Sequence, residues 1–531
     1  MKSRILFWSI TSALAGFLFG FDTVVISGAE KRIQSLWNLS PEMHGFAIAS
    51  ALYGTVFGSL FGGWPTDRFG RKPTLIGVGL LYIVSAVGCG LAWDVYSLIA
   101  FRLLGGIGIG VSTVAAPLYI SEISPPAYRG RLAGMFQFNI VFGIIVAFLS
   151  NYLLEGIGEN AWRWMLGVAA FPSLVYTVMC LAIPESLRWL LSRKRDREAG
   201  LRVLRLIQPE ASPAELEAVA DEIQAASPAA AEGKSFWTRR LRFPIVLAFL
   251  VAFFNQLSGI NAILYFAPRI FGLTGLEEKA ALLQSVGIGV TNLVFTFVGL
   301  WLIDRLGRRT LLYIGSFGYI ASLGLCAWAF FNWAPQFHAA STALGVKDAV
   351  AAVQGATAAN RGESENRLTE RTKALEAASR TEGAGTTPIS FPPSASHENM
   401  LQVADTALKQ ASAASGSGGL LVLACIFAFI AAHAIGQGAV IWVFISEIFP
   451  NRHRAAGQTL GSSTHWVFAA LLTTVFPVML NAMPPGFIFL FFCGMMVLQL
   501  LWVAVMVPET KGVPLEELER RLTGGPEGVR S

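Results

Sequence analysis

Charged side chains are scarce in this chain of 531 residues. Asp, Glu, Lys and Arg account for 14% of it, hydrophobic residues account for 54%, and the mean hydropathy is +0.55. A soluble domain of this length cannot bury so much apolar surface, so the composition excludes an ordinary soluble protein. The sequence therefore predicts an integral membrane protein.

Cysteine is also rare. The chain has five cysteines, each inside an apolar run, and none forms a Cys-x-x-Cys pair, which argues against a disulfide framework or a zinc site. The loops show no nucleophile–base set, metal cluster or phosphate loop, so we expect neither an enzyme nor a cofactor. The glycines of Gly105-Gly106-x-Gly108-x-Gly110 lie in an apolar run with no preceding strand, which favours helix packing over nucleotide binding.

Long apolar runs follow one another through most of the chain. We count about twelve, each of roughly 20 residues and long enough to cross a bilayer as a helix. The first contains Asp22 and lacks an obvious cleavage site, so it is interpreted as a retained helix and not a signal peptide. The runs begin near Ile5, His44, Thr74, Ser97, Leu132, Trp164, Phe243, Ala281, Thr310, Gly419, Gln458 and Gly486.

Lys and Arg gather in alternate loops. Examples are the segments 68–72, 188–205 and 305–309, whereas the intervening loops carry few basic residues. By the positive-inside rule both termini are expected in the cytoplasm, with the protein in the plasma membrane, the inner membrane of a bacterium. The net charge of +6 is then explained by anchoring at the membrane face and not by nucleic-acid binding.

Three short patterns occur twice, in the same order. Gly62-x4-Asp67-Arg68-x-Gly70-Arg71-Lys72 returns as Gly299-x4-Asp304-Arg305-x-Gly307-Arg308-Arg309. Ser121-Glu122-Ile123-x-Pro125 with Arg129 returns as Ser446-Glu447-Ile448-x-Pro450 with Arg454, and Pro184-Glu185-Ser186 returns as Pro508-Glu509-Thr510. Matching landmarks in two halves indicate an internal duplication, which in an apolar chain is typical of transporters. The fold class expected is an all-α membrane protein with twelve transmembrane helices in two pseudo-symmetric six-helix bundles.

The offset between copies grows by roughly 88 residues after the first pattern, which places an insertion in the second half. The polar stretch 333–418 fits, with helix-prone pieces at Arg367–Ala378 and Met400–Ala411, and its low hydrophobicity suggests a mobile or loosely helical external domain. The expected organisation is an N-terminal bundle (1–183), a cytoplasmic helical linker (184–242), helices seven to nine (243–332), the external insertion (333–418), helices ten to twelve (419–507) and a cytoplasmic tail (508–531).

Together, the doubled motifs, their order and the number of spans resemble the sugar porter family of the major facilitator superfamily, over the whole chain except the insertion. The seventh span reads Gln256-Leu257-Ser258-Gly259-Ile260-Asn261, similar to the sugar-binding helix of that family, and the first reads Gly20-Phe21-Asp22-Thr23. The resemblance implies a transporter that works by alternating access. The tenth span lacks the prolines that many members carry, so its bend is expected to rest on glycine.

The repeated loop motifs place carboxylates beside guanidinium groups at helix ends. Such pairs can lock the cytoplasmic side when it is closed and must separate when it opens, although basic residues there could also serve only as topological anchors. The Glu-x6-Arg spacing predicts two further pairs, Glu122 with Arg129 and Glu447 with Arg454, and Glu185 and Glu509 can reach the same arginines. The residues of this expected charge network are Asp67, Arg68, Arg71, Glu122, Arg129, Glu185, Asp304, Arg305, Arg308, Glu447, Arg454 and Glu509.

A sugar site needs amides for the hydroxyls and aromatic rings for the C–H faces. Several amides lie in otherwise apolar spans, where each requires a ligand or a partner on another helix, so helix–helix hydrogen bonds are the alternative for any one of them. The family positions imply rings at Phe19, Trp442 and Trp466, and external gate residues at Tyr265 and Phe266. The remaining expected sugar-binding residues are Gln137, Asn255, Gln256, Asn261, Asn292 and His465. Asn255, Phe266 and His465 depart from the usual family residues, which leaves the sugar undetermined.

Asp22 lies in an apolar helix, where a charge costs about 2.5 to 3.5 kcal/mol, so it must be paired or protonated. Arg102 stands where proton-coupled members have an arginine, and neutral residues typically replace the aspartate in facilitators. The sequence thus favours a symporter that imports a hexose or pentose with a proton, acting as a monomer. The alternatives are a static Asp22–Arg102 pair in a facilitative sugar or polyol uniporter, and a non-transporting sugar sensor.

Overall fold

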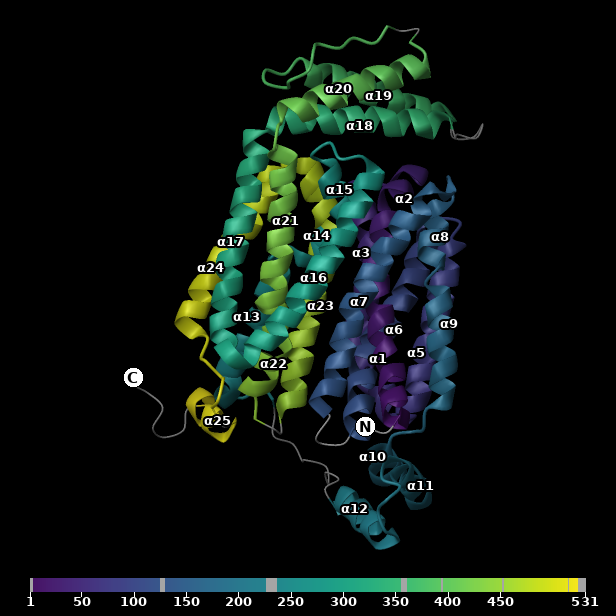
Figure 1. The fold of residues 1–531 in the computed structure, drawn as a ribbon, viewed down its shortest axis with the longest axis vertical. Helices are drawn as coiled ribbons and strands as arrows, with labels where there is room; N and C mark the ends of the chain where they lie inside the picture. Colours follow the sequence, from purple (N-terminus) through teal and green to yellow (C-terminus); the bar gives the residue numbers. More distant parts are fainter. Residues whose placement is uncertain are drawn as a thin grey trace.

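The computed structural model describes residues 3–124, 129–225, 236–354, 361–392, 395–450, 453–513 and 515–523. Within these ranges twelve helical segments are long and apolar enough to cross a membrane, which confirms the predicted number of spans. They stand side by side and form one bundle with two ends (Figure 1). The N-terminus and the last helix lie at one end, called here the terminal face, and the opposite end is called the cap face.

The first six spans form the N-terminal half. Within it the first helix packs on the fifth span, and the second packs on the fourth. Its helices are α1 (Ser3–Val25), α3 (Pro41–Phe61), α5 (Arg71–Gly90), α6 (Val95–Ile123), α7 (Arg129–Leu154) and the sixth span, formed by α8 (Ala161–Gly167) and α9 (Ala170–Ala182).

The other six spans form the C-terminal half, in which two spans are interrupted. The seventh comprises α13 (Arg242–Leu257), α14 (Ile260–Tyr265) and the short α15 (Ala267–Gly272) beyond it, and the tenth comprises α21 (Gly418–Ile435) and α22 (Gln437–Ile448). The others are α16 (Glu278–Leu306), α17 (Arg308–Asn332), α23 (Arg454–Ala482) and α24 (Pro485–Met506).

Both interruptions occur at glycine. Gly259 has a φ of +88°, in the left-handed region that favours glycine, and it separates α13 from α14. Gly436 separates α21 from α22, and a Cβ there would lie 2.8 Å from the Cα of Gly315 on α17. The bend of the tenth span therefore rests on glycine, as predicted from its lack of proline.

The halves meet along two symmetry-related helix pairs, α3 with α23 and α7 with α16. At the first pair a Cβ on Gly45 would lie 1.9 Å from the carbonyl oxygen of Thr474, so only glycine permits the observed approach. The Tyr53 hydroxyl is 3.0 Å from the Thr474 hydroxyl across the same contact. A site formed by both halves must therefore lie between these two contacts.

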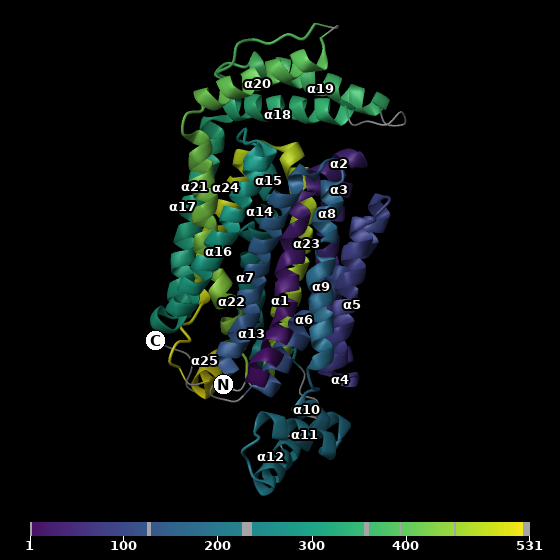
Figure 2. The same cartoon turned by 45° about the vertical axis from the view of Figure 1, so that its right-hand side comes forward.

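The terminal face carries short helices that follow the spans: α4 (Gly63–Arg68), α10 (Leu187–Trp189), α11 (Arg197–Ile207), α12 (Pro213–Ala225) and α25 (Leu515–Thr523). Helices α11 and α12 belong to the segment predicted as a helical linker. Figure 2 shows α10 to α12 below the bundle.

The cap face carries α2 (Glu30–Leu36) and three helices of the insertion: α18 (Ala334–Gln354), α19 (Arg361–Ser379) and α20 (His397–Ala414). These three, called the cap, lie across the end of the bundle in both views (Figures 1 and 2). They share a buried core that includes Val346, Leu375 and Ala407. The expected loose segment is thus a small packed domain. Its first helix was not predicted, because it is rich in alanine and lacks a strong polar–apolar period.

Candidate functional site

Four predicted residues meet at the break in the seventh span. Gln256 donates to the side-chain oxygen of Asn255 at 2.9 Å and approaches the imidazole of His465 at 3.1 Å, and Asn261 donates to Gln256 Oε1 at 2.7 Å. Gln256 is fully buried, and Asn255 and Asn261 are nearly so. The left-handed turn at Gly259 makes this possible, because it brings Asn261 of α14 back to the end of α13.

Aromatic rings lie next to these amides. The ring of His465 is 4.7 Å from Trp466 and 5.3 Å from Trp442, measured between centroids. Phe19, on α1 of the other half, contacts the edge of Trp466 at 5.5 Å. The cluster therefore joins residues of both halves and combines polar groups with ring faces, the combination that a sugar requires.

Gln137 and Asn292 are half-buried, on α7 and α16, which pack against each other across the two halves. Neither has a described hydrogen bond to the Gln256 cluster. Both residues lie on helices at the interface between the two halves. Their part in ligand binding stays a prediction.

The sequence missed an extension of the amide cluster into the C-terminal half. Asn255 contacts Gln437 at 3.4 Å, Gln437 donates to Gln499 at 2.7 Å, and Gln499 donates to the Ser316 hydroxyl at 2.9 Å. Gln437 and Gln499 are both fully buried. Each is a lone amide in an apolar run, which is the signal that could have identified them. This series of hydrogen bonds connects the Gln256 cluster to α22, α24 and α17.

The predicted gate residues are completely enclosed. Tyr265 and Phe266 are at most 1% exposed. Phe266 packs against Phe476 at 5.2 Å and against His44 of the other half at 5.9 Å. The two halves are therefore in contact on the cap side of the amide cluster.

A buried ion pair reinforces this contact and was not predicted. Glu30 of α2 accepts from Arg269 of α15 at 2.7 Å and 3.0 Å, and Arg269 also donates to Gln34 at 2.6 Å. Glu30 and His44 are fully buried, with His44 Nε2 3.1 Å from the Glu30 carboxylate. Because α2 belongs to one half and α15 to the other, the bidentate pair joins them.

Glu30 predicts a pH dependence. Burial alone would raise its pKa, but Arg269 and His44 outweigh burial and lower the pKa from 4.5 to about 2. Its contribution to the stability of this closed state, on the order of 3 kcal/mol, is full above about pH 4.5 and is lost as the pH falls through about 2. We expect thermal unfolding of the purified protein to show this acid loss, and Glu30→Gln to lack it. Glu159→Gln, at an exposed pair with Arg32, is the matched control. An identical acid profile for Glu30→Gln and the unmodified protein would contradict this reading.

Asp22 and Arg102 lie within electrostatic range of each other but do not form an ion pair in this state. Asp22 Oδ2 and the Arg102 atoms Nε and Nη2 are buried without a hydrogen-bond partner. The predicted contact is therefore absent here. Buried polar atoms without partners are costly, so this arrangement favours a rearrangement that gives both groups partners.

The charge network of the terminal face has two equivalent centres. Arg71 binds Glu122 through two hydrogen bonds of 2.9 Å and 3.0 Å and contacts Asp67 at 3.2 Å. In the second half, Arg308 binds Glu447 at 2.7 Å and 3.1 Å and contacts Asp304 at 3.4 Å. Each pair stays within one half, so these bonds brace the halves individually in this state.

Glu185 and Glu509 were expected to bind the guanidinium groups. In the structure they bind backbone N–H groups at helix N-termini. Glu185 accepts from the backbone N–H of Arg71 at 2.9 Å, and Glu509 accepts from that of Arg308 at 2.9 Å, so each carboxylate caps a helix N-terminus. The preceding glycines, Gly70 and Gly307, have φ of +104° and +90°. A Cβ at either would collide with the carboxylate, which explains the fixed glycine of the motif.

Arg68 and Arg305 do not join the carboxylates. Arg68 lies over the ring of Trp64 at 5.6 Å, and Arg305 lies over Trp301 at 3.8 Å. Each of these cation–π contacts lies at the end of a span. For these two arginines the contacts fit the alternative that basic residues at the helix ends serve as topological anchors.

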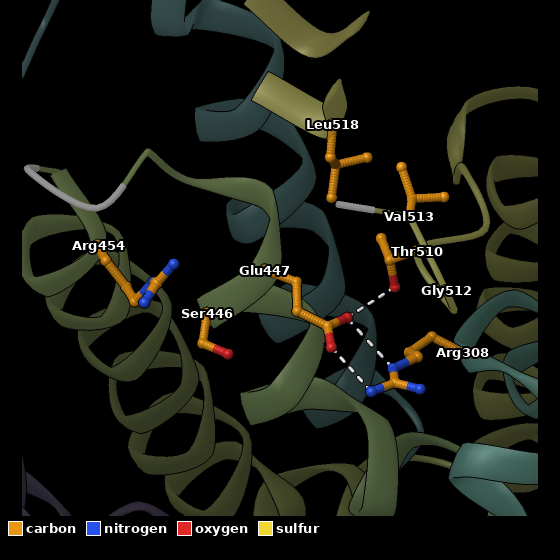
Figure 3. Close-up of a pocket in the computed structure, with 8 residues that line it drawn as sticks. All are labelled: Arg308, Ser446, Glu447, Arg454, Thr510, Gly512, Val513 and Leu518. Atoms are coloured by element: carbon orange, nitrogen blue, oxygen red, sulfur yellow. Dashed lines mark hydrogen bonds and ion pairs between the residues drawn. The ribbon is translucent and has the colours of Figure 1, made fainter. Parts of the chain in front are cut away.

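The predicted partners Glu447 and Arg454 are separated. Glu447 points to Arg308 and Thr510, whereas Arg454 lies on the other side of the cavity that they line, which has a volume of about 330 Å³ (Figure 3). Arg454 Nε is buried without a partner. The side chain of Arg129, the equivalent residue in the first half, lies outside the described residues.

Comparisons with known proteins agree with this architecture. The family model for sugar (and other) transporters matches residues 8–350 and 400–522. The chain is 28% identical to the arabinose-proton symporter of Bacillus subtilis, over 96% of this chain and 94% of that protein, and 27% identical to the D-xylose-proton symporter of Escherichia coli, over 98% and 96%. It is also similar to the inward-open structure of the E. coli xylose transporter XylE, with a TM-score of 0.69 and 26% identity over 97% and 99% of the two chains. This chain is therefore a member of the sugar transporter family, with the fold of the major facilitator superfamily.

Proposed function

We propose that this protein is a monosaccharide–proton symporter that carries a hexose or a pentose across a membrane by alternating access. The observation that carries the proposal is the buried cluster of Gln256, Asn261 and His465 against Trp466, closed by Phe19 from the other half. Similar proteins are named as symporters of arabinose and of xylose with protons. The amides would donate to and accept from hydroxyl groups while the rings cover the C–H faces.

The terminal face is assigned to the cytoplasm and the cap face to the exterior, because the basic loops lie at the terminal face. In this orientation the protein is closed to the outside and the two arginine–glutamate centres are confined to their own halves. Similarity to an inward-open transporter supports the same state. The membrane is expected to be the plasma membrane of a bacterium, and the active unit a monomer.

The mechanism follows from the charges. In the outward-facing state an ionised Asp22 would attract Arg102, and protonation would remove that attraction. Sugar bound between Phe19 and the Gln256 cluster would then draw the halves together on the cap side, bury Tyr265 and Phe266, and form the Glu30–Arg269 pair. The unpartnered atoms of Asp22 and Arg102 support assigning the present state to the stage after this release. Loss of the proton and sugar to the cytoplasm would reset the transporter.

Proteoliposomes test the proposal. We expect addition of the transported sugar to alkalinise the medium on the cap side, in the absence of a membrane potential, together with counterflow of labelled sugar. Pentoses, hexoses and inositols would be screened in parallel, because the site does not specify the sugar. Counterflow without a pH change would indicate a uniporter of sugar or polyol. The absence of counterflow for every sugar that binds would indicate a sensor.

A further inference from the structure

The cap is tied by its chain connections to the C-terminal half only. Helix α18 follows α17 after the single residue Trp333, and α21 follows α20 after a short turn. Residues 351–399, which include α19, fall outside the match to the family model. The match therefore covers most of α18 and α20 but not α19. The C-terminal half must carry the whole cap during any movement of the two halves.

Side-chain contacts hold the cap down on its own half. Lys347 of α18 contacts Glu277, just before α16, at 2.6 Å and Asp405 of α20 at 2.9 Å. The loop before α16 also touches the cap directly, because a Cβ on Gly275 would lie 2.7 Å from Ala340. A movement of α15 and α16 is therefore transmitted to the cap.

The far end of the cap reaches the N-terminal half. Arg367 of α19 donates through Nη1 to the backbone oxygen of Ser35 on α2 at 2.6 Å. Asp348 of α18 lies within electrostatic range of Lys31, also on α2. Helix α2 is the same element that supplies Glu30 to the ion pair between the halves.

We propose that the cap is an external clamp: it is carried by the C-terminal half and grips α2 of the N-terminal half, so that it stabilises the outward-closed state of the transporter. Opening to the outside moves α2 away from α15, and this movement must break the Arg367–Ser35 bond and separate Lys31 from Asp348. The clamp acts in addition to the Glu30–Arg269 pair and shifts the population toward the inward-facing state. The inference rests on the proposed alternating access.

The test measures exposure of the contact between the halves. Ser27 lies in the turn η1 (Ile26–Gly28), which contacts α14 and α15, and it is 2% exposed with no hydrogen-bond partner for its hydroxyl. Ser27→Cys keeps the size of the side chain, and the five native cysteines are all buried. The rate at which a membrane-impermeant maleimide modifies this cysteine from the cap side reports outward opening.

Two variants of the full-length protein weaken the clamp at different contacts. Arg367→Gln removes the contact of the cap with the N-terminal half, and Lys347→Gln removes its contact with Glu277 of the C-terminal half. Arg367→Gln loses the bond to Ser35, and Lys347→Gln loses the bonds to Glu277 and to Asp405. We expect each variant to speed labelling of the Ser27→Cys protein by roughly three- to tenfold, the size of a net hydrogen-bond contribution of about 1 kcal/mol. The matched control is Arg380→Gln, which removes an exposed arginine at the end of α19. We expect the control to label at the unmodified rate.

The outcomes separate the clamp from the proposed function. Faster labelling in both variants and not in the control supports the clamp. Equal rates in all four proteins, or an equal increase in the control, overturns it, even if sugar counterflow in the same vesicles is normal. Absence of counterflow in the unmodified protein overturns the transport proposal. The labelling rates of the four proteins can still be compared, because they are measured independently of transport.

Discussion

Asp22→Asn is expected to abolish uphill accumulation of sugar and to preserve exchange of sugar across the membrane. The substitution keeps the shape of the side chain but removes the group that can bind and release a proton. One proton crossing 100 mV is worth about 2.3 kcal/mol, enough for roughly 50-fold accumulation. The ratio of internal to external sugar in energised vesicles should therefore fall from such a value to 1, while counterflow remains.

The matched control is Asp221→Asn, which removes an exposed carboxylate of α12 that pairs with Arg197 at the terminal face. Exposed pairs contribute little, so this variant should accumulate sugar normally. If Asp22→Asn also accumulated sugar against its gradient, Asp22 would not be the coupling group, and the static ion-pair interpretation of Asp22 and Arg102 would be favoured.

Gln256→Leu is expected to weaken sugar binding by roughly 5- to 150-fold. The variant removes the amide that holds Asn255, Asn261 and His465 together, and it leaves buried polar groups and the sugar hydroxyls without partners, at a cost of about 1–3 kcal/mol. The dissociation constant is measured by titrating the purified protein with the identified sugar while recording the heat released or the tryptophan fluorescence.

Asn139→Leu is a suitable control for this experiment. Asn139 is also a buried amide in a span, but it donates to the backbone oxygen of Met135 within its own helix. We expect the sugar affinity of the Asn139→Leu protein to change less than threefold, because no described contact links Asn139 to the Gln256 cluster. Equal losses in the two variants would show that amides in the spans act by maintaining the fold and not by binding sugar.

Local patterns were sufficient for the spans and for the repeated loops. An apolar run of about 20 residues has few alternatives to a transmembrane helix, because every backbone polar group must be satisfied within it. The glycine before Arg71 and Arg308 likewise follows from local geometry, since only glycine tolerates a positive φ beside a capping carboxylate. The partner of each arginine depended on contacts between helices, so Glu447 was linked by spacing to Arg454 although it binds Arg308.

The insertion shows the opposite case. Its sequence is rich in alanine and polar residues and resembles a loose segment, whereas α18 to α20 bury a shared core of small side chains. Alanine-rich helices carry a weak amphipathic signal, and their stability comes from neighbours that a linear pattern does not reveal. The contact of Arg367 with Ser35 joins residues 332 positions apart and could not be anticipated from either segment.

The sequence by itself determined that this protein spans a membrane twelve times, that its halves are copies, and which amides and carboxylates stand in apolar surroundings where they need partners. These properties follow from composition, helix length and spacing along one chain. Only the tertiary structure decided which groups meet: Gln256 with His465 and Asn261, Glu30 with Arg269, and Asp22 apart from Arg102. The reason is physical, because such pairings depend on how separate helices pack and on which face of the transporter is closed, and neither is encoded in a local pattern.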